Sequence, residues 1–152
     1  MNNVYLSLGT NSGNKPQNLL KAIILICQKT GILSALSSVY ETKSWGFESD
    51  NDFLNMVVCV ETLFSPEEIL TITQSIEKII GREEKTNDIY FDRVIDIDII
   101  AYEDLIIYSE NLIIPHPLFH KRQFVLEPMN EVAPDYVHPV LLKKVCEIVV
   151  ND

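Results

Sequence analysis

Residues 94–102 read Val-Ile-Asp-Ile-Asp-Ile-Ile-Ala-Tyr, a run of β-branched residues that predicts a strand. Before it, the sequence Ser65-Pro66-Glu67-Glu68 is a capping box with proline at the first helical position. Isoleucines at helical spacing follow, which predicts a helix that Gly81 ends. This helix and strand complete a series of elements that starts near the N-terminus.

The N-terminal part of the chain contributes four earlier elements to that series. Residues 4–8 are an apolar run and predict a strand, after which Asn14 can cap a helix that Pro16 opens and Gly31 ends. Residues 37–44 and 53–62 are rich in strand formers. The predicted order is therefore βαββαβ, whose connections give an antiparallel sheet with both helices on one face, a ferredoxin-like α+β fold.

The last third of the chain predicts additions to this fold. A turn at Glu103-Asp104 leads into a hairpin partner at 105–108, and helical segments are expected near 118–127 and 141–150. With 152 residues, 47% apolar and 22% charged, the chain is typical of one globular domain, residues 1–152. The start of the chain lacks the pattern of a secretory signal, and no apolar run reaches the roughly 18 residues of a membrane span. We therefore expect a cytoplasmic protein without a membrane partner.

The charge of the chain limits what it binds. The formal net charge of −10 repels phosphate backbones and argues against nucleic-acid binding, so a phosphorylated ligand needs a local group of cations or metal ions. The segment from Gly9 to Lys15 is not a phosphate-binding P-loop, because only three residues separate its two glycines. Cys27, Cys59 and Cys146 lie far apart among apolar residues, which favours reduced thiols in the core over a disulfide or metal framework.

Asp96 and Asp98 alternate with isoleucines and are the most informative residues of the chain. Side chains two apart on a strand share one face, with their backbones roughly 6 to 7 Å apart. Both carboxylates can then contact one metal ion or a close pair of ions, and hard oxygen ligands suit Mg²⁺ that is held jointly with substrate phosphates. The alternative is a solvent-facing strand edge.

Arginine is used in only one part of the chain. Nine lysines are scattered, whereas the three arginines, Arg82, Arg93 and Arg122, fall within 41 residues around the aspartates. Arginine binds phosphate through two nitrogens, so this usage indicates oxyanion recognition, with structural ion pairs as the alternative. His116 stands between two prolines, which restrict its backbone.

Aromatic residues suggest a second kind of site. Trp45 and Phe47 lie in a polar loop, and Phe53 and Asn55 begin the strand that follows. Aromatic rings and an amide together can hold and read a flat heterocycle. An aromatic corner of the core explains the same composition equally well.

These residues belong to a pattern that covers nearly the whole chain. The motifs include residues 5–11, 38–42 and 53–55, Glu77 with Gly81-Arg82, residues 92–99, Ile114-Pro115-His116-Pro117, 122–126 and Pro128. In these motifs the chain resembles the 6-hydroxymethyl-7,8-dihydropterin pyrophosphokinases of folate biosynthesis. The resemblance implies a transfer of pyrophosphate from ATP to the pterin hydroxymethyl group with release of AMP, on a ferredoxin-like fold with two Mg²⁺ ions.

The resemblance also implies roles for individual residues. Asp96 and Asp98 would hold both Mg²⁺ ions, Arg82 and Arg93 would stabilise charge on the β- and γ-phosphates, and His116 would contact a phosphate of ATP. Further ATP contacts would come from Gln74, Glu77, Lys85 and Arg122. The pterin would be bound by Thr42, Lys43, Trp45, Phe53, Asn55 and Phe124.

The chain departs from the family pattern between the first two arginines. Many members carry a second basic residue two positions after the first arginine, where Glu84 stands here, and Lys85 is the expected substitute. The expected partners are two small molecules, ATP and the pterin, and the chain is expected to act as a monomer. Two other classes remain open from the residues alone: a ligand-binding module without chemistry, and a metal-dependent nuclease.

Overall fold

The computed structural model describes residues 1–43, 52–83 and 94–150, and the backbone alone at 82–83. Its elements, in chain order, are β1 (Asn2–Thr10), α1 (Lys15–Lys29), β2 (Gly31–Leu36), β3 (Tyr40–Thr42), β4 (Phe53–Thr62), α2 (Pro66–Glu83), β5 (Asp96–Tyr102), β6 (Ile107–Tyr108), β7 (Ile113–Ile114), the 3₁₀ turn η1 (Phe119–Lys121), α3 (Gln123–Val132) and the 3₁₀ turn η2 (Val145–Glu147). None of the helices in these ranges is long and apolar enough to cross a membrane.

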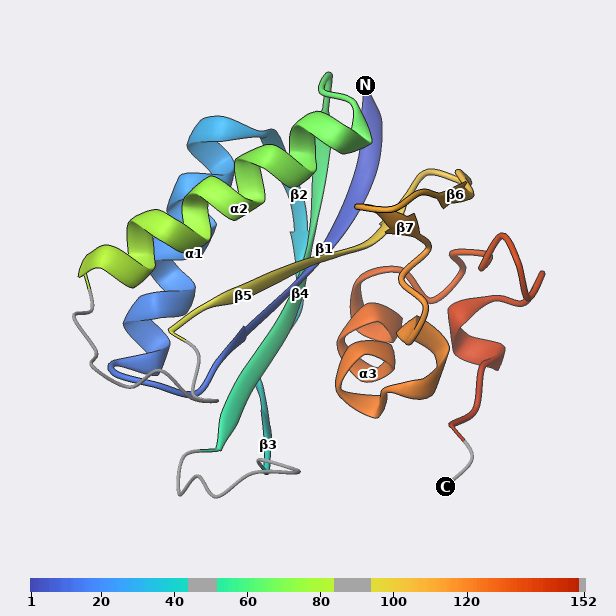
Figure 1. Cartoon of the computed structure of the whole chain (residues 1–152). Helices are drawn as coiled ribbons and strands as arrows, with labels where there is room; N and C mark the ends of the chain where they lie inside the picture. Colours follow the sequence, from blue (N-terminus) through green and yellow to red (C-terminus); the bar gives the residue numbers. More distant parts are fainter. Residues whose placement is uncertain (44–51, 84–93, 151–152) are drawn as a thin grey trace.

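The main sheet has the strand order β2-β4-β1-β5, and β3 pairs with the remaining end of β4. Every pairing in it is antiparallel. Figure 1 shows α1 and α2 on one face of the sheet and α3 on the opposite face. The predicted ferredoxin-like α+β fold with both early helices on one face is therefore confirmed.

Alternation along the strands divides the core into two layers. Leu6 and Leu8 of β1 and Ile97 of β5 are buried against α1 and α2. Val57 of β4 and Ile100 of β5 belong to the smaller cluster beneath α3. Consecutive strand residues face opposite sides of a sheet. Ser7, between Leu6 and Leu8, and the aspartates on either side of Ile97 therefore lie on the α3 side. This side of the sheet thus carries both aspartates of β5.

The predicted strand 37–44 is wrong in its start and its length. β2 begins at Gly31, directly after α1, and β3 covers only Tyr40–Thr42. Gly31 has a φ of 157°, and a Cβ there would collide with the carbonyl oxygen of Glu61 on β4. Glycine thus lets the chain pass from a helix end into an edge strand without a connecting loop.

The additions after β5 also differ from prediction. The turn at Glu103-Asp104 forms, with the Leu105 amide donating to the carbonyl oxygen of Tyr102, but β6 then pairs with β7 and not with β5. α2 continues two residues past Gly81, and the helix expected at 118–127 is η1 followed by α3.

Within 141–150 only η2 forms. The His138 side chain accepts from the Val140 and Leu141 amides, and Leu142 adopts a left-handed φ of 58°, so no helix starts there.

Cys146 of η2 is exposed, and Cys27 is exposed as well. The prediction of core thiols is therefore wrong for these two residues and holds for the buried Cys59.

Candidate active site

One row of residues crosses the α3 side of the sheet and forms the base of the site. Asp96 of β5 lies opposite Gly9 of β1, Gly9 lies opposite Asn55 of β4, and Asn55 lies opposite Tyr40 of β3. Asp98 lies opposite Ser7 in the neighbouring row. Residues directly opposite on antiparallel strands share a face, so two carboxylates from β5 and an amide from β4 reach one surface, with Ser7 and Gly9 of β1 between them.

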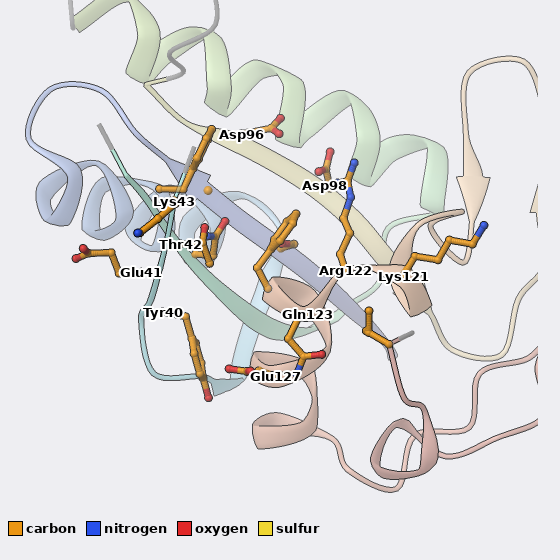
Figure 2. A pocket seen from close by; sticks show the side chains of 16 residues that line it. Tyr40, Glu41, Thr42, Lys43, Asp96, Asp98, Lys121, Arg122, Gln123 and Glu127 are labelled. Carbon is orange, nitrogen blue, oxygen red and sulfur yellow. Dashed lines mark hydrogen bonds between the residues drawn. The ribbon is translucent and has the colours of Figure 1, made fainter. Parts of the chain in front are cut away.

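This surface is the floor of a cavity of about 760 Å³, a size typical of small-molecule sites. β3 bounds it on one side, and the segment from η1 into α3 bounds it on the other (Figure 2). Its lining comprises Ser7, Gly9, Tyr40, Glu41, Thr42, Lys43, Phe53, Asn55, Asp96, Asp98, Lys121, Arg122, Gln123, Phe124, Glu127 and Val150.

The Asn55 amide is held in place at the centre of the floor. Asn55 is 5% exposed, and its Nδ2 donates to Thr42 Oγ1 over 2.9 Å. A Cβ on Gly9 would lie 3.2 Å from Asn55 Oδ1. Glycine therefore leaves the room that the amide occupies, and the hydrogen bond to Thr42 fixes its orientation.

Two carboxyl groups lie at the β5 end of the cavity, and a third lies at the outer edge of the same strand. Asp96 and Asp98 are half-buried on the cavity side, and Glu77 of α2 reaches the edge of the same strand. Glu77 Oε2 accepts from the Ile97 amide over 2.8 Å. Burial, together with the neighbouring carboxylates of Asp96 and Asp98, raises the pKa of Glu77 to about 7, although the Ile97 bond acts in the opposite direction.

The donor set at this end suits a hard divalent cation. No group of three or more acidic, histidine or cysteine ligands occurs among residues 1–43, 52–81 and 94–150. Two carboxylates on one strand face leave most positions around an ion open. Mg²⁺ uses such sites, because it keeps water or substrate phosphate as its other ligands.

Cationic and aromatic groups lie across from the carboxylates. Arg122 precedes α3 with an extended backbone, and Figure 2 shows its side chain extending toward Asp98. The guanidinium carbon lies 5.3 Å from the centre of the Phe124 ring, within range of a cation–π contact. Lys43 and Lys121 also line the cavity. Positive charge is therefore available to an anionic ligand despite the acidic chain.

His116 lies beside this group, although it does not line the cavity. Its pKa is lowered by burial and by the Arg122 charge, and Asp96 opposes both effects. His116 Nδ1 accepts from the Leu118 amide over 3.1 Å. In the neutral ring this bond places the proton on Nε2, which is then a hydrogen-bond donor.

The family model for 7,8-dihydro-6-hydroxymethylpterin-pyrophosphokinase (HPPK) matches residues 5–134. The chain belongs to this family. A 2-amino-4-hydroxy-6-hydroxymethyldihydropteridine pyrophosphokinase of Porphyromonas gingivalis is 44% identical over 138 residues, which are 90% of this chain and 93% of the relative. The pyrophosphokinase of Aquifex aeolicus is 40% identical over 147 residues, 97% of this chain and 90% of the relative. The predicted family and enzyme class are confirmed, and HPPK enzymes use ATP as co-substrate.

Solved structures agree on the fold. The wild-type HPPK-DHPS of Plasmodium falciparum matches with a TM-score of 0.74 at 18% sequence identity. The match covers 95% of this chain and 43% of that one, so this chain spans less than half of the Plasmodium chain. A triple mutant of the same protein with SDX-DHP matches with a TM-score of 0.76 at 19% identity.

The structure brings eight of the predicted HPPK site residues together in one cavity. They are Thr42, Lys43, Phe53, Asn55, Asp96, Asp98, Arg122 and Phe124. Gln74 is exposed on α2 and does not line the cavity, and Glu77 meets the outer edge of β5. Trp45, Lys85 and Arg93 lie outside the described residues, as does the Arg82 side chain, whose backbone belongs to the last turn of α2. The individual roles stay predictions.

Several lining residues were not predicted as site residues. Ser7 and Gly9 could have been found, because they alternate with buried leucines on β1 in the way that the aspartates alternate with isoleucines on β5. Tyr40 could not, since its place depends on the pairing of a three-residue strand. Lys121 and Glu127 depend on where α3 packs, which no periodicity in the sequence indicates.

Proposed function

We propose that the chain transfers the pyrophosphoryl group of ATP to the hydroxymethyl group of 6-hydroxymethyl-7,8-dihydropterin, using two Mg²⁺ ions bound by Asp96 and Asp98. One observation carries this assignment to the site. The register places the Asp96 carboxylate and the Asn55 amide on either side of Gly9 on one cavity floor. A metal-bound phosphate and a heterocycle can therefore lie next to each other.

The Asn55 end binds the pterin. Asn55 presents an amide whose orientation is fixed by Thr42, and it reads the hydrogen-bonding edge of the ring. Phe53 and Phe124 line the cavity from β4 and α3 and stack on the ring faces. The cost of ordering the ring is lowered because the amide is already oriented before the pterin binds.

The Asp96 and Asp98 end binds the reacting phosphates. Bound Mg²⁺ neutralises charge on the phosphate oxygens as it develops. In the reaction, the hydroxymethyl oxygen forms a bond to the β-phosphorus, and the bond from that phosphorus to the oxygen of the α-phosphate breaks, so AMP leaves. The hydroxyl proton passes to a carboxylate oxygen of Asp96 or Asp98.

The cations complete charge neutralisation. Arg122 lies on the α3 side of the phosphates, and its contact with the Phe124 ring holds the guanidinium in place. His116 donates from Nε2 to a phosphate oxygen, consistent with the bond that Nδ1 accepts from Leu118. Arg82, Arg93 and Lys85 are assigned to the remaining ATP contacts, with Gln74 and Glu77 on the nucleotide side.

The working form is proposed to be a cytoplasmic monomer. Eight of the assigned residues line one cavity within one chain, so a second chain is not needed to complete the pterin and aspartate ends. ATP is abundant in the cytoplasm, which suits this location.

The proposal is tested by measuring AMP and pterin diphosphate formed from ATP, the pterin and Mg²⁺. Asp96→Ala and Asp98→Ala should each abolish both products while the circular dichroism spectrum stays that of the wild type. Asp104→Ala, at an exposed position after β5, is the matched control and should retain activity. Full activity in both aspartate variants, or no product from folded wild type, would overturn the assignment.

A further inference from the structure

One carboxylate at the surface connects two walls of the cavity. Glu131 of α3 accepts three hydrogen bonds, two at Oε1 and one at Oε2. The Ser38 amide and the Tyr40 hydroxyl each donate to Oε1 over 2.9 Å, and the Ser38 hydroxyl donates to Oε2 over 2.8 Å. Donors and acceptor are more than 90 residues apart in the sequence, so the contact depends on the tertiary fold.

The hydrogen bonds to Glu131 favour its ionised form. The Ser38 amide first, then the hydroxyls of Ser38 and Tyr40, lower the pKa of Glu131 although the side chain is fully exposed. The same bond raises the pKa of the Tyr40 hydroxyl. Hydrogen bonds to an ionised acceptor are stronger than neutral ones. The ionised form of Glu131 is therefore the one that holds Ser38 and Tyr40.

The strand held in this way has little other support. β3 is three residues long, and among the residues that the structure describes it pairs with the end of β4 alone, where Tyr40 lies opposite Asn55 and Thr42 lies opposite Phe53. A two-stranded segment of this length is marginal in water. A second attachment, to α3, therefore matters for where Thr42 lies.

The helix end of the contact is equally close to the site. Phe124, Glu127 and Glu131 recur at spacings of three and four along α3, which puts them on one face of the helix. Phe124 and Glu127 line the cavity, as does Tyr40 on the opposite wall (Figure 2). The hydrogen bonds of Glu131 thus join the wall that carries Phe124 to the wall that carries Tyr40 and Thr42.

We propose that Glu131 is a positioning residue that sets the separation of these two walls and so the fit of a flat heterocycle between them. The inference rests on the proposed pterin site and adds a specificity role for a residue that does not line the cavity. Glu131 acts through Ser38 and Tyr40. It touches neither the phosphates nor the aspartates, so its effect is confined to the heterocycle end of the site.

The test compares Glu131→Ala with Asn130→Ala, an exposed neighbour on the same helix. In Glu131→Ala the KM for the pterin and its Kd from direct titration calorimetry should rise about 5- to 10-fold. The kcat and the KM for ATP should stay within about twofold of wild type. Asn130→Ala should behave as wild type. A kcat loss equal to the KM change, or an unchanged pterin Kd in Glu131→Ala, would overturn the positioning role.

A second variant separates positioning from general stability. Ser38→Ala removes the hydroxyl bond to Oε2 and keeps the amide bond, so the pterin Kd should rise about two- to threefold. The double variant Ser38→Ala, Glu131→Ala should be no weaker than Glu131→Ala alone, because both changes break one contact. Additive effects would contradict the model. If wild type binds no pterin, the proposed function fails, whereas normal pterin binding in Glu131→Ala refutes the positioning role alone.

Discussion

The polar groups at the two ends of the cavity have different surroundings. At the β5 end, burial and the charges of Asp96 and Asp98 raise the pKa of Glu77 to about 7. At the β3 end, Asn55 bonds to Thr42, and Glu131 bonds to Ser38 and Tyr40, so the groups satisfy one another. The opposite pKa directions of Glu77 and Glu131 express this difference.

The comparison shows which end depends on a ligand. Burial beside the carboxylates of Asp96 and Asp98 opposes the ionisation of Glu77, and a bound cation would lower that cost. The Asn55 amide already has its hydrogen bond to Thr42 in the free protein, so the pterin ring only has to replace solvent there. Neutralising the Glu77 carboxyl should therefore stabilise the protein above pH 7, whereas removing the Asn55 amide should destabilise it.

The largest effect is expected from Asp98→Asn. It should reduce kcat by about 10³-fold or more, because a carboxylate that binds the metal is lost. In metal-free protein the same change should lower the pKa of Glu77, because the Asp98 charge is one of the causes that raise it. Rapid-quench assays and an NMR titration of the Glu77 carboxyl measure the two effects.

The control for Asp98→Asn is Asp104→Asn, outside the crowded group, which should change neither quantity. An unchanged pKa of Glu77 in Asp98→Asn would break the comparison, because it would show that the neighbouring charge does not act on this carboxyl.

The next largest effect is expected from Asn55→Ala. The change removes the amide and leaves the Thr42 hydroxyl without its donor. The kcat/KM for the pterin should fall by about 10²-fold, and the free energy of unfolding should fall by about 1 to 2 kcal/mol. Steady-state kinetics and thermal unfolding check both, with Asn130→Ala as the exposed amide control. A stabilised Asn55→Ala protein would contradict the description of this end.

A third prediction concerns pH, measured on metal-free protein. The pKa of Glu77 is raised on folding, so its contribution favours the folded state below about pH 4.5 and is lost as the pH rises through about 7. The amide of Glu77→Gln does not ionise, so the variant should not lose stability as the pH rises. Above pH 7 its free energy of unfolding should be about 2 kcal/mol higher than that of wild type. Urea unfolding between pH 4 and 8 measures the difference.

Glu131→Gln is the matched comparison and should give the opposite sign. The pKa of Glu131 is lowered, so its contribution is present above its ordinary value near 4.5 and is lost as the pH falls. Wild type should therefore be the more stable protein at neutral pH and should lose that advantage in acid. The same sign for both variants would refute the contrast between the two ends.

The smallest effect is expected from Gly9→Ala, which lies between the two ends. The new Cβ would lie 3.2 Å from Asn55 Oδ1, so the amide has to move by a few tenths of an ångström. The KM for the pterin should rise about threefold while the KM for ATP stays unchanged. A larger effect on ATP than on the pterin would show that Gly9 belongs to the phosphate end.

Much of this site was predictable because it depends on local patterns. The alternation of Asp96 and Asp98 with isoleucines fixes their common face, and the capping box at Ser65 fixes the start of α2. Local patterns failed after Tyr102, where the chain pairs with β7 and not with β5, and at Gly31, where one glycine replaces a loop. The failure at Gly31 involves a close approach to Glu61 of β4, a residue that the local sequence does not contain.

The contacts of Glu77 and Glu131 were beyond prediction for the same reason. Glu77 meets an amide 20 residues away, and Glu131 meets donors 91 and 93 residues away. Both glutamates stand on amphipathic helices, where an acidic residue normally marks a solvent-facing position. Only the packing of α2 and α3 against the sheet shows that these two carboxylates have specific partners.

The position of Glu77 at the outer side of β5 has a consequence for self-association. β5 ends the strand order of the sheet, so its outer backbone amides could template the addition of a strand from another molecule. The Glu77 carboxylate accepts from the Ile97 amide in the first half of β5. An incoming chain would have to displace that bond and approach a cluster of acidic groups. The side chain thus protects an apolar edge strand against aggregation.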